Sequence, residues 1–181
     1  MNVKFLTYLI TSLAAVAIGA TSAQTKITNQ SKVNIYGIGA IRVGMTVTEA
    51  SRVEGTKLVY KGKNVEPSCD FVFPQGAPKG LGFMVVDGRI ARVDVYDKSF
   101  ITTLSGAKIG DTEARIKALY PGQIKVTPHK YTGDSGGHYL TYVPKDKSDR
   151  NYRLVFETDG KRVTNFRAGK LPEVEYVEGC S

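Results

Sequence analysis

The clearest pattern of hydrophobic and polar positions lies in the middle of the chain. Residues 81–86 are almost all apolar, Asp87-Gly88 follows, and residues 89–96 place charged side chains among apolar ones. Asp-Gly suits a type I′ turn, because both central residues take positive φ, which Gly adopts freely and Asp tolerates. The pattern predicts a β-hairpin over 81–96 whose second strand exposes a charged face to solvent.

Two stretches of the chain open in the same way. Residues 42–46 (Arg-Val-Gly-Met-Thr) and residues 108–112 (Lys-Ile-Gly-Asp-Thr) each precede a segment with the spacing of a short helix, and strand-like runs follow both. In each segment an Asp-Gly pair then falls between two strand-like runs, at 87–88 and at 159–160. This similarity indicates a duplicated unit.

Both predicted helices begin at a threonine. The Thr46 hydroxyl can accept a backbone N–H at the N-cap, Glu49 lies three residues further on as in a capping box, and Gly55 ends the helix. Thr112 holds the same place before the second helix, which ends at Pro121-Gly122. We therefore expect one short helix in each copy.

The fold class predicted from these elements is α+β. It consists of two tandem repeats, each a short helix followed by antiparallel strands, which form an extended or concave antiparallel sheet with the helices on one face. Residues 24–40 are expected to be a lead-in with an edge strand, 41–104 the first repeat, and 105–181 the second repeat with a C-terminal tail. Beyond the hairpin, strands are predicted at 33–41, 58–60, 69–73, 123–127, 138–143, 152–157, 162–166 and 174–177.

Residues 1–23 have the features of a signal peptide. Lys4 supplies a positive charge, residues 5–18 form an apolar stretch, and residues 21–23 (Thr-Ser-Ala) provide a cleavage site before Gln24. The apolar stretch is too short and too interrupted for a membrane span, and no later run approaches the ~18 continuous apolar residues of a span. No cysteine near the cleavage site could carry a lipid. We expect a periplasmic or secreted protein without an integral membrane anchor.

The two cysteines, Cys69 and Cys180, would both enter an oxidising compartment. An even count in such a compartment favours a disulfide, and the bond would tie the first repeat to the end of the chain. In the chain-entropy model a loop of about 100 residues makes such a bond worth ~4 kcal/mol. The alternative is two separate thiols. The chain is long enough to bury a hydrophobic core of its own, so we expect no cofactor.

The charge of the chain favours acidic partners. The formal net charge is +8, and removal of Lys4 with the signal peptide would leave +7. Basic residues are nevertheless spread along the chain among acidic ones, and the densest run, 145–150, nearly neutralises itself. Because no nucleic-acid motif or basic stripe interleaved with aromatic residues is present, we expect no nucleic-acid partner.

Three patterns in the sequence bear on catalysis or metal binding. Residues 133–137 (Gly-Asp-Ser-Gly-Gly) match the segment around the nucleophile of trypsin-like serine proteases, but the only histidine before Ser135 is His129, in the same expected hairpin. His129 and His138, with Asp134 between them, are too few for a usual zinc site. Nothing marks a pair of catalytic carboxylates among Asp70, Asp87, Asp94 and Glu157. The sequence therefore predicts neither catalytic residues nor a metal site.

A cluster of aromatic and cationic residues is the candidate binding surface. Tyr and His present a flat apolar body with a polar tip, which suits recognition of proteins or sugars. Basic side chains at Arg89, Arg92 and Arg167 would add to this surface if they share its sheet face. The alternative is that the cluster is structural. Its members are His129, Lys130, Tyr131, His138, Tyr139 and Tyr142.

The Gly-x-Thr openings at 42–46 and 108–112, each followed by a short helix and antiparallel strands, resemble the repeat of the β-lactamase inhibitor protein and of the related BamE-type outer-membrane assembly lipoproteins. The match covers mainly residues 42–53 and 108–119. The resemblance implies helices packed on an antiparallel sheet, two copies side by side, and a concave sheet face that docks a protein. The chain departs from this pattern because it lacks the lipoprotein cysteine and because Cys69 has no counterpart in the second copy.

Three functions follow, in decreasing order of support. The first is an exported, non-catalytic module that binds or inhibits a protein of the cell envelope or exterior through shape and charge complementarity. The second is a binder of an acidic glycan or another anionic ligand of the envelope, for which binding should weaken steeply with salt. The third is a secreted hydrolase, which would need a site assembled from both copies.

Overall fold

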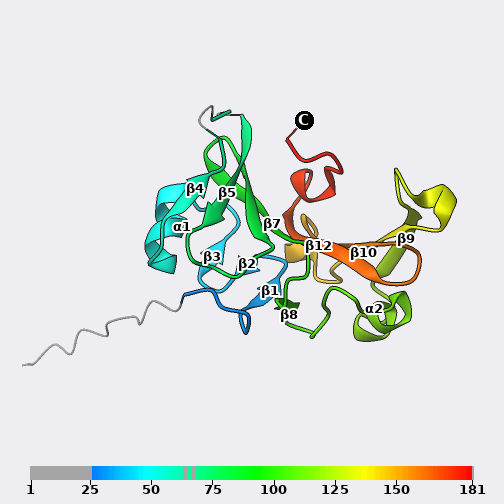
Figure 1. Cartoon of the computed structure of the whole chain (residues 1–181). Coiled ribbons are helices and arrows are strands. Elements are labelled where there is room, and N and C mark those ends of the chain that lie inside the picture. Colours follow the sequence, from blue (N-terminus) through cyan, green and yellow to red (C-terminus); the bar gives the residue numbers. More distant parts are fainter. Residues whose placement is uncertain (1–25, 63–64, 67, 181) are drawn as a thin grey trace, which may run out of the picture.

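The computed structural model describes residues 26–62, 65–66 and 68–180 (Figure 1). The predicted signal peptide, residues 1–23, lies outside the described residues. The predicted division of the rest of the chain at residues 40 and 104 stays a prediction.

The strands form two sheets. The larger has eight strands in the order β4-β5-β6-β7-β12-β11-β10-β9, all antiparallel, and the smaller has four in the order β3-β2-β1-β8. The elements are β1 (Lys32–Asn34), β2 (Gly37–Ile38), β3 (Ile41–Arg42), α1 (Val47–Glu54), β4 (Leu58–Tyr60), β5 (Cys69–Pro74), β6 (Leu81–Val86), β7 (Arg89–Val95), β8 (Thr102–Thr103), α2 (Glu113–Leu119), β9 (Ile124–Pro128), η1 (Gly133–Ser135), β10 (His138–Tyr142), η2 (Lys147–Asp149), β11 (Tyr152–Thr158), β12 (Val163–Lys170) and η3 (Glu173–Glu175).

The predicted fold class, an α+β protein of two helix-plus-strand repeats, is wrong. The described residues contain only two α-helices, of eight and seven residues, and most of the regular structure is strand. The second sheet was not expected at all. It pairs β8 parallel to β1, with Lys32 opposite Thr102. Pairing between segments so far apart leaves no local pattern in the sequence, so the prediction did not include it.

The predicted hairpin is confirmed, but its exposed face is not. Strands β6 and β7 are joined by Asp87 and Gly88 at φ 49° and 73°, as a type I′ turn requires. On β7, however, Arg92 is only 4% exposed. The C-terminal segment covers the strand at Arg92, whereas Arg89 at its start is exposed.

Both predicted helix starts are confirmed. The Thr46 hydroxyl accepts the N–H of Glu49, and the Glu49 carboxylate accepts the N–H of Thr46, which completes the capping box. Gly55 ends α1 in the left-handed conformation at φ 64°. The Thr112 hydroxyl accepts the N–H of Arg115 at the start of α2.

Two predicted strands are wrong. The expected edge strand 33–41 is broken by turns at 35–36 and 39–40 into β1, β2 and the start of β3. Gly37 permits this close return of the chain, because a Cβ there would lie only 2.0 Å from the Ile41 carbonyl oxygen. The expected strand 174–177 is instead a 3-10 turn, η3, followed by irregular chain. The other predicted strands match observed ones within a few residues at each end.

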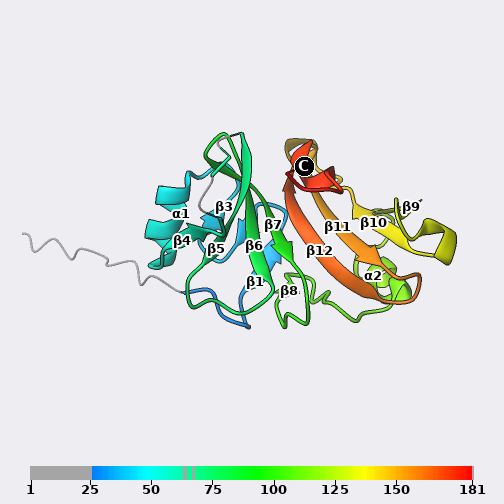
Figure 2. The same ribbon diagram turned by 45° about the horizontal axis from the view of Figure 1, so that its top comes forward.

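One face of the large sheet packs on the hydrophobic core. The same buried cluster holds Ala50 of α1, Ile116 of α2 and Val33 of the small sheet, together with Phe83 and Phe156 of the large sheet. The C-terminal segment lies on the opposite face, against β7, β11 and β12 (Figure 2). We call residues 171–180 the tail and this opposite face the tail-side face. No helix among the described residues is long and apolar enough to cross a membrane.

The predicted disulfide is confirmed. Cys69 on β5 is bonded to Cys180 at the end of the tail, with a Cα–Cα distance of 5.3 Å and a sequence separation of 111. The bond is compatible with an exported protein. It fixes the end of the tail to the far half of the large sheet.

Candidate binding surface

The six residues of the predicted surface divide between two faces of the sheet. On β10, Tyr139 points to the tail-side face, where it packs with Val174. His138 and Tyr142 lie on the other face, and the Tyr142 ring is 5.0 Å from Tyr120, next to the main core. Successive side chains of a strand alternate between faces, so these three residues could not form one surface. That alternation was available from the sequence.

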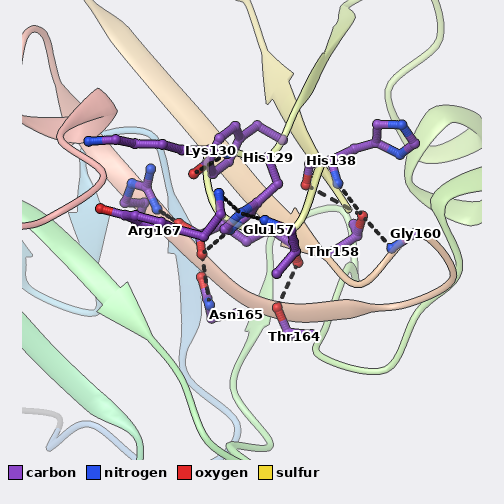
Figure 3. A network of polar contacts seen from close by, with 12 residues as sticks. His129, Lys130, His138, Glu157, Thr158, Gly160, Thr164, Asn165 and Arg167 are labelled. Carbon is purple, nitrogen blue, oxygen red and sulfur yellow. Dashed lines mark hydrogen bonds and ion pairs between the residues drawn. The ribbon is translucent and has the colours of Figure 1, made fainter. Parts of the chain in front are cut away.

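His129 supports the exposed loop instead of presenting its own ring. The imidazole stacks on Tyr139, with the ring centres 4.5 Å apart and the planes at 23°. Its Nδ1 accepts the N–H of Tyr131 at 3.1 Å, and its Nε2 lies 3.4 Å from a Glu157 oxygen (Figure 3). Tyr131 is 61% exposed, and the adjacent Lys130 is also exposed. The stacked and hydrogen-bonded imidazole thus keeps the loop in place, with the Tyr131 side chain exposed to solvent.

His138 belongs to a separate polar network. Its Nδ1 lies 2.8 Å from a Glu113 oxygen of α2, and the Thr158 hydroxyl donates to the same oxygen at 2.6 Å. Burial acts to raise the pKa of Glu113, but the hydrogen bonds from Thr158 and His138 outweigh it, and the pKa lies below its ordinary value. Figure 3 shows the His138 ring turned away from His129. The two histidines therefore do not converge, and no group of three metal-ligating side chains occurs in the described part of the chain.

Two buried arginines hold the tail on the sheet. Arg92 on β7 donates to the carbonyl oxygens of Glu173 and Tyr176, at 2.9 and 2.7 Å. Arg167 on β12 donates to the carbonyl oxygen of Val174 at 2.6 Å, and it is 5% exposed. The polar backbone of the tail is thus partnered where it is buried. Sequence reasoning missed this role, although a charged residue between apolar neighbours in each strand was the available signal.

Each arginine is paired with a carboxylate, and the pKa values of the two carboxylates are shifted in opposite directions. Arg92 is 3.0 Å from Asp94, and Arg167 is paired with Glu157. Burial raises the pKa of Asp94, and the charge of Arg92 opposes this without cancelling it. Burial also acts to raise the pKa of Glu157, but the charge and hydrogen bonds of its partners, Arg167 first, hold it below its ordinary value.

A hollow opens between the tail and the outer strands of the sheet. Its volume is about 380 Å³. Arg153 on β11 and Glu175 on the tail are 3.8 Å apart across it. A second hollow on the tail is bordered by Lys130, which pairs with Glu178. The first is lined by Lys125, Thr127, Tyr139, Thr141, Val143, Arg153, Val155, Arg167, Glu175 and Val177.

We call the two hollows, with the exposed rings of Tyr131 and Tyr176, the tail-side surface. Tyr176 is 43% exposed, and the Tyr131 hydroxyl is hydrogen bonded to Glu178, so the loop and the tail form one continuous surface. Of the predicted binding residues, Lys130, Tyr131 and Tyr139 contribute to it and His129 supports it. The contribution of the tail was not predicted.

Ser135 is not assembled with a base. It lies on the exposed turn η1, and no hydrogen bond joins its hydroxyl to a histidine within the described residues. His129 already uses both ring nitrogens, one with backbone N–H groups and one with Glu157. A nucleophile requires a base within hydrogen-bond reach, so this geometry gives the hydrolase hypothesis no support.

The chain was compared with protein-family models and with curated proteins. No family model matches it, and no curated protein matches it.

Proposed function

We propose that this chain is an exported, non-catalytic binding module that docks a protein of the cell envelope or exterior on its tail-side surface. The observation that carries the proposal is the hollow of about 380 Å³ between the tail and the outer strands, on the face that also carries the exposed Tyr131 and Tyr176. Exposed tyrosines beside a pocket are typical anchors of protein interfaces. The disulfide and the two buried arginines keep the surface in one conformation, which lowers the entropic cost of binding.

The charges of the tail-side surface favour a protein over an anionic polymer. Lys130 is paired with Glu178, Arg153 with Glu175 and Arg167 with Glu157, so most cations there already have a carboxylate partner. Such mixed charge provides complementarity to one specific partner but little attraction for a uniformly acidic chain. The resemblance to the repeat of the inhibitor protein and of the BamE-type lipoproteins also implies that a protein docks on a sheet face. The proposal takes only this mode of docking from the resemblance.

The test is capture of envelope proteins with the chain from Gln24 in its oxidised form, at low and at high salt. The first variant is Tyr131→Ala with Tyr176→Ala, because both side chains are exposed and their loss should not unfold the protein. The control variant is Phe100→Ser with Leu104→Ser, two exposed apolar residues that flank β8 of the small sheet. We expect one protein at near-equal stoichiometry that survives high salt, is lost with the tyrosine variant and is kept by the control.

Two results would contradict the proposal. Equal capture by the tyrosine variant would place the interface elsewhere. Recovery only of material that is removed by salt would favour the anionic glycan instead. Alanine at Tyr139 and Tyr142 is not a suitable test, because Tyr139 is mostly buried against Val174 and Tyr142 packs beside the core.

A further inference from the structure

The two most exposed large apolar side chains of the described residues flank the short strand β8. Phe100 is 75% exposed and Leu104 is 68% exposed, whereas Ile101 and Thr103 between them are buried. Strand β8 itself is Thr102–Thr103, and Leu104 lies in the turn after it. Exposure alternates along the segment, so Phe100 and Leu104 are on its solvent side, with the half-buried Thr102 between them. The buried alternate residues anchor the segment in the core, so the two apolar side chains are held in solvent by the fold and not by local mobility.

Three lysines that lack ion pairs among the described residues lie near Phe100 and Thr102. The Lys32 ammonium is 2.7 Å from the Thr102 hydroxyl, on the neighbouring strand β1. Lys79 and Lys98 border a hollow of about 640 Å³ that Phe100 also lines. None of the three lysines pairs with a carboxylate among the residues that the structure describes. The other residues lining the hollow are Asn29, Pro78, Asp97 and Ser99, of which only Asp97 is acidic.

This group, Phe100, Thr102, Leu104, Lys32, Lys79 and Lys98, is called the β8 surface. It differs from the tail-side surface in its charge, because the cations there are mostly paired and those here are not. It also lies elsewhere on the molecule. In both views of the chain β8 is at the lower side and the tail is at the upper side (Figures 1 and 2). A partner on one surface would leave the other accessible.

We propose that the β8 surface docks on a lipid membrane with anionic head groups. Two side chains without a polar tip would enter the boundary between head groups and acyl chains, and the lysines would remain at the level of the phosphates. An acidic glycan offers charge but no apolar interior for Phe100 and Leu104. A second copy of the chain would bring two sets of unpaired lysines together, which like-charge repulsion disfavours. The combination of apolar and cationic groups therefore selects an anionic lipid surface.

Docking through the β8 surface would also orient the rest of the molecule. With β8 on a membrane, the tail-side surface would face away from the lipid, toward the aqueous phase. Lipid docking does not depend on the proposed protein partner, and each can fail without the other.

The test is flotation with lipid vesicles, using the oxidised chain from Gln24 so that the apolar residues 5–18 cannot insert. Vesicles contain phosphatidylcholine alone or mixed in roughly equal parts with phosphatidylglycerol. We expect binding to the anionic vesicles that is at least roughly tenfold tighter than to the neutral ones and that weakens with salt. The variant Phe100→Ser with Leu104→Ser should lower the anionic partition coefficient by at least about tenfold.

A charge variant and a matched control complete the experiment. Lys32→Gln, Lys79→Gln and Lys98→Gln together should lower the partition coefficient by at least about tenfold on anionic vesicles and leave that on neutral ones unchanged. Tyr131→Ser with Tyr176→Ser removes exposed aromatic area from the tail-side surface and should keep vesicle binding. Melting temperatures of all variants show that they are folded.

Three results would overturn the proposal. The first is no preference for anionic vesicles. The second is vesicle binding by the Phe100 and Leu104 variant within about twofold of the unmodified chain, which would leave no role for insertion. The third is binding of soluble polyglutamate or alginate as tight as that of anionic vesicles, which would identify an acidic macromolecule instead of a lipid surface.

Discussion

The large sheet consists of two groups of four consecutive strands, β4–β7 and β9–β12. Each group has a hydrogen bond from an arginine to the carbonyl oxygen of a glycine near the start of a helix. In the first group the Arg89 guanidinium donates to the carbonyl oxygen of Gly44 at 2.9 Å, and in the second Arg162 donates to that of Gly110 at 2.7 Å. In each case the glycine precedes the threonine that caps the helix. The same short motif therefore builds the same corner twice, even though the fold is not the predicted pair of helix-plus-strand repeats.

The groups differ on the tail-side face. In the first group the disulfide fixes the tail to β5, and a Cβ on Gly179 would lie 3.3 Å from the Phe71 ring, so the tail closes this part of the face. In the second group the tail packs through Val174 but leaves the hollow beside Arg153 open. The difference shows that the tail, and not the strands themselves, decides where the face is free to bind.

The largest expected effect comes from removing the disulfide. Cys69→Ser with Cys180→Ser opens a loop with a sequence separation of 111, for which the chain-entropy relation gives a loss of about 4–5 kcal/mol in the free energy of unfolding. Urea denaturation of the oxidised chain and of the variant measures it. A loss below ~1 kcal/mol would show that the unfolded chain gains little freedom when the bond is removed, because residual structure already restricts it.

Hydrogen exchange of the same variant separates the two groups. The contacts of Val174 and of Arg167 with the tail do not depend on the disulfide. We therefore expect protection to persist at the amides of Glu175 and Tyr176, which donate to the carbonyl oxygens of Pro172 and Glu173. Loss of protection along the whole tail would mean that the first group, through the disulfide, holds all of it.

The next effect comes from Arg167→Met. Glu157 would remain buried without its cation, and removal of one partner of a buried pair costs about 3–5 kcal/mol. The double variant with Glu157→Gln leaves no unpaired charge, so it should recover a large part of that loss. Denaturation of the two single variants and the double variant gives the coupling energy. Equal losses in Arg167→Met and in the double variant would show that the tail contact, not the ion pair, carries the effect.

The pH dependence of stability distinguishes the two buried carboxylates, Glu157 and Asp94. The pKa of Glu157 is lowered in the folded state, so its contribution to stability is present above its unfolded pKa of about 4.3 and is lost as pH falls toward the folded value. The pKa of Asp94 is raised, so its contribution is present at acid pH and is lost as pH rises through the folded value. Glu157→Gln should therefore reduce the acid-induced loss of stability, and Asp94→Asn should increase it. Unfolding curves between acid and neutral pH test the two signs.

Local features of the fold could be predicted from the sequence, whereas the tertiary ones could not. The capping threonines, the type I′ turn at Asp87 and the disulfide follow from residue types at short range or from a count of two cysteines. The pairing of β8 with β1 and the seating of the tail depend on contacts between segments far apart in the chain, which no periodicity records. For the candidate site, the alternation of side chains along the predicted strand at 138–143 is enough to place Tyr139 and Tyr142 on opposite faces.

A smaller effect distinguishes the Asp-Gly turns of the two groups. Gly88 and Gly160 both have positive φ, 73° and 89°, which costs a side chain roughly 1–2 kcal/mol. A Cβ at Gly88 would meet nothing within 4 Å, but one at Gly160 would lie 2.4 Å from the Gly136 carbonyl oxygen. Gly160→Ala should therefore destabilise by about 2–3 kcal/mol and Gly88→Ala by about 1 kcal/mol, as measured by urea denaturation. Equal losses would mean that the chain around Gly136 moves without cost.

The smallest expected effect concerns the two helix caps. Thr46 and Glu49 form a reciprocal capping box, whereas Thr112 accepts one bond and has Arg115 in the place of the glutamate. Thr46→Ala should lower the free energy of unfolding by about 1–1.5 kcal/mol and Thr112→Ala by about 0.5–1 kcal/mol, since only the first change breaks two bonds. Adding Glu49→Ala to Thr46→Ala should then cost a further part of the capping energy, because the carboxylate still accepts the backbone N–H of residue 46 after the first change. If Thr112→Ala proves as costly as Thr46→Ala, the hydrogen bonds of Arg89 to Gly44 and of Arg162 to Gly110, and not the caps, determine the stability of both helix starts.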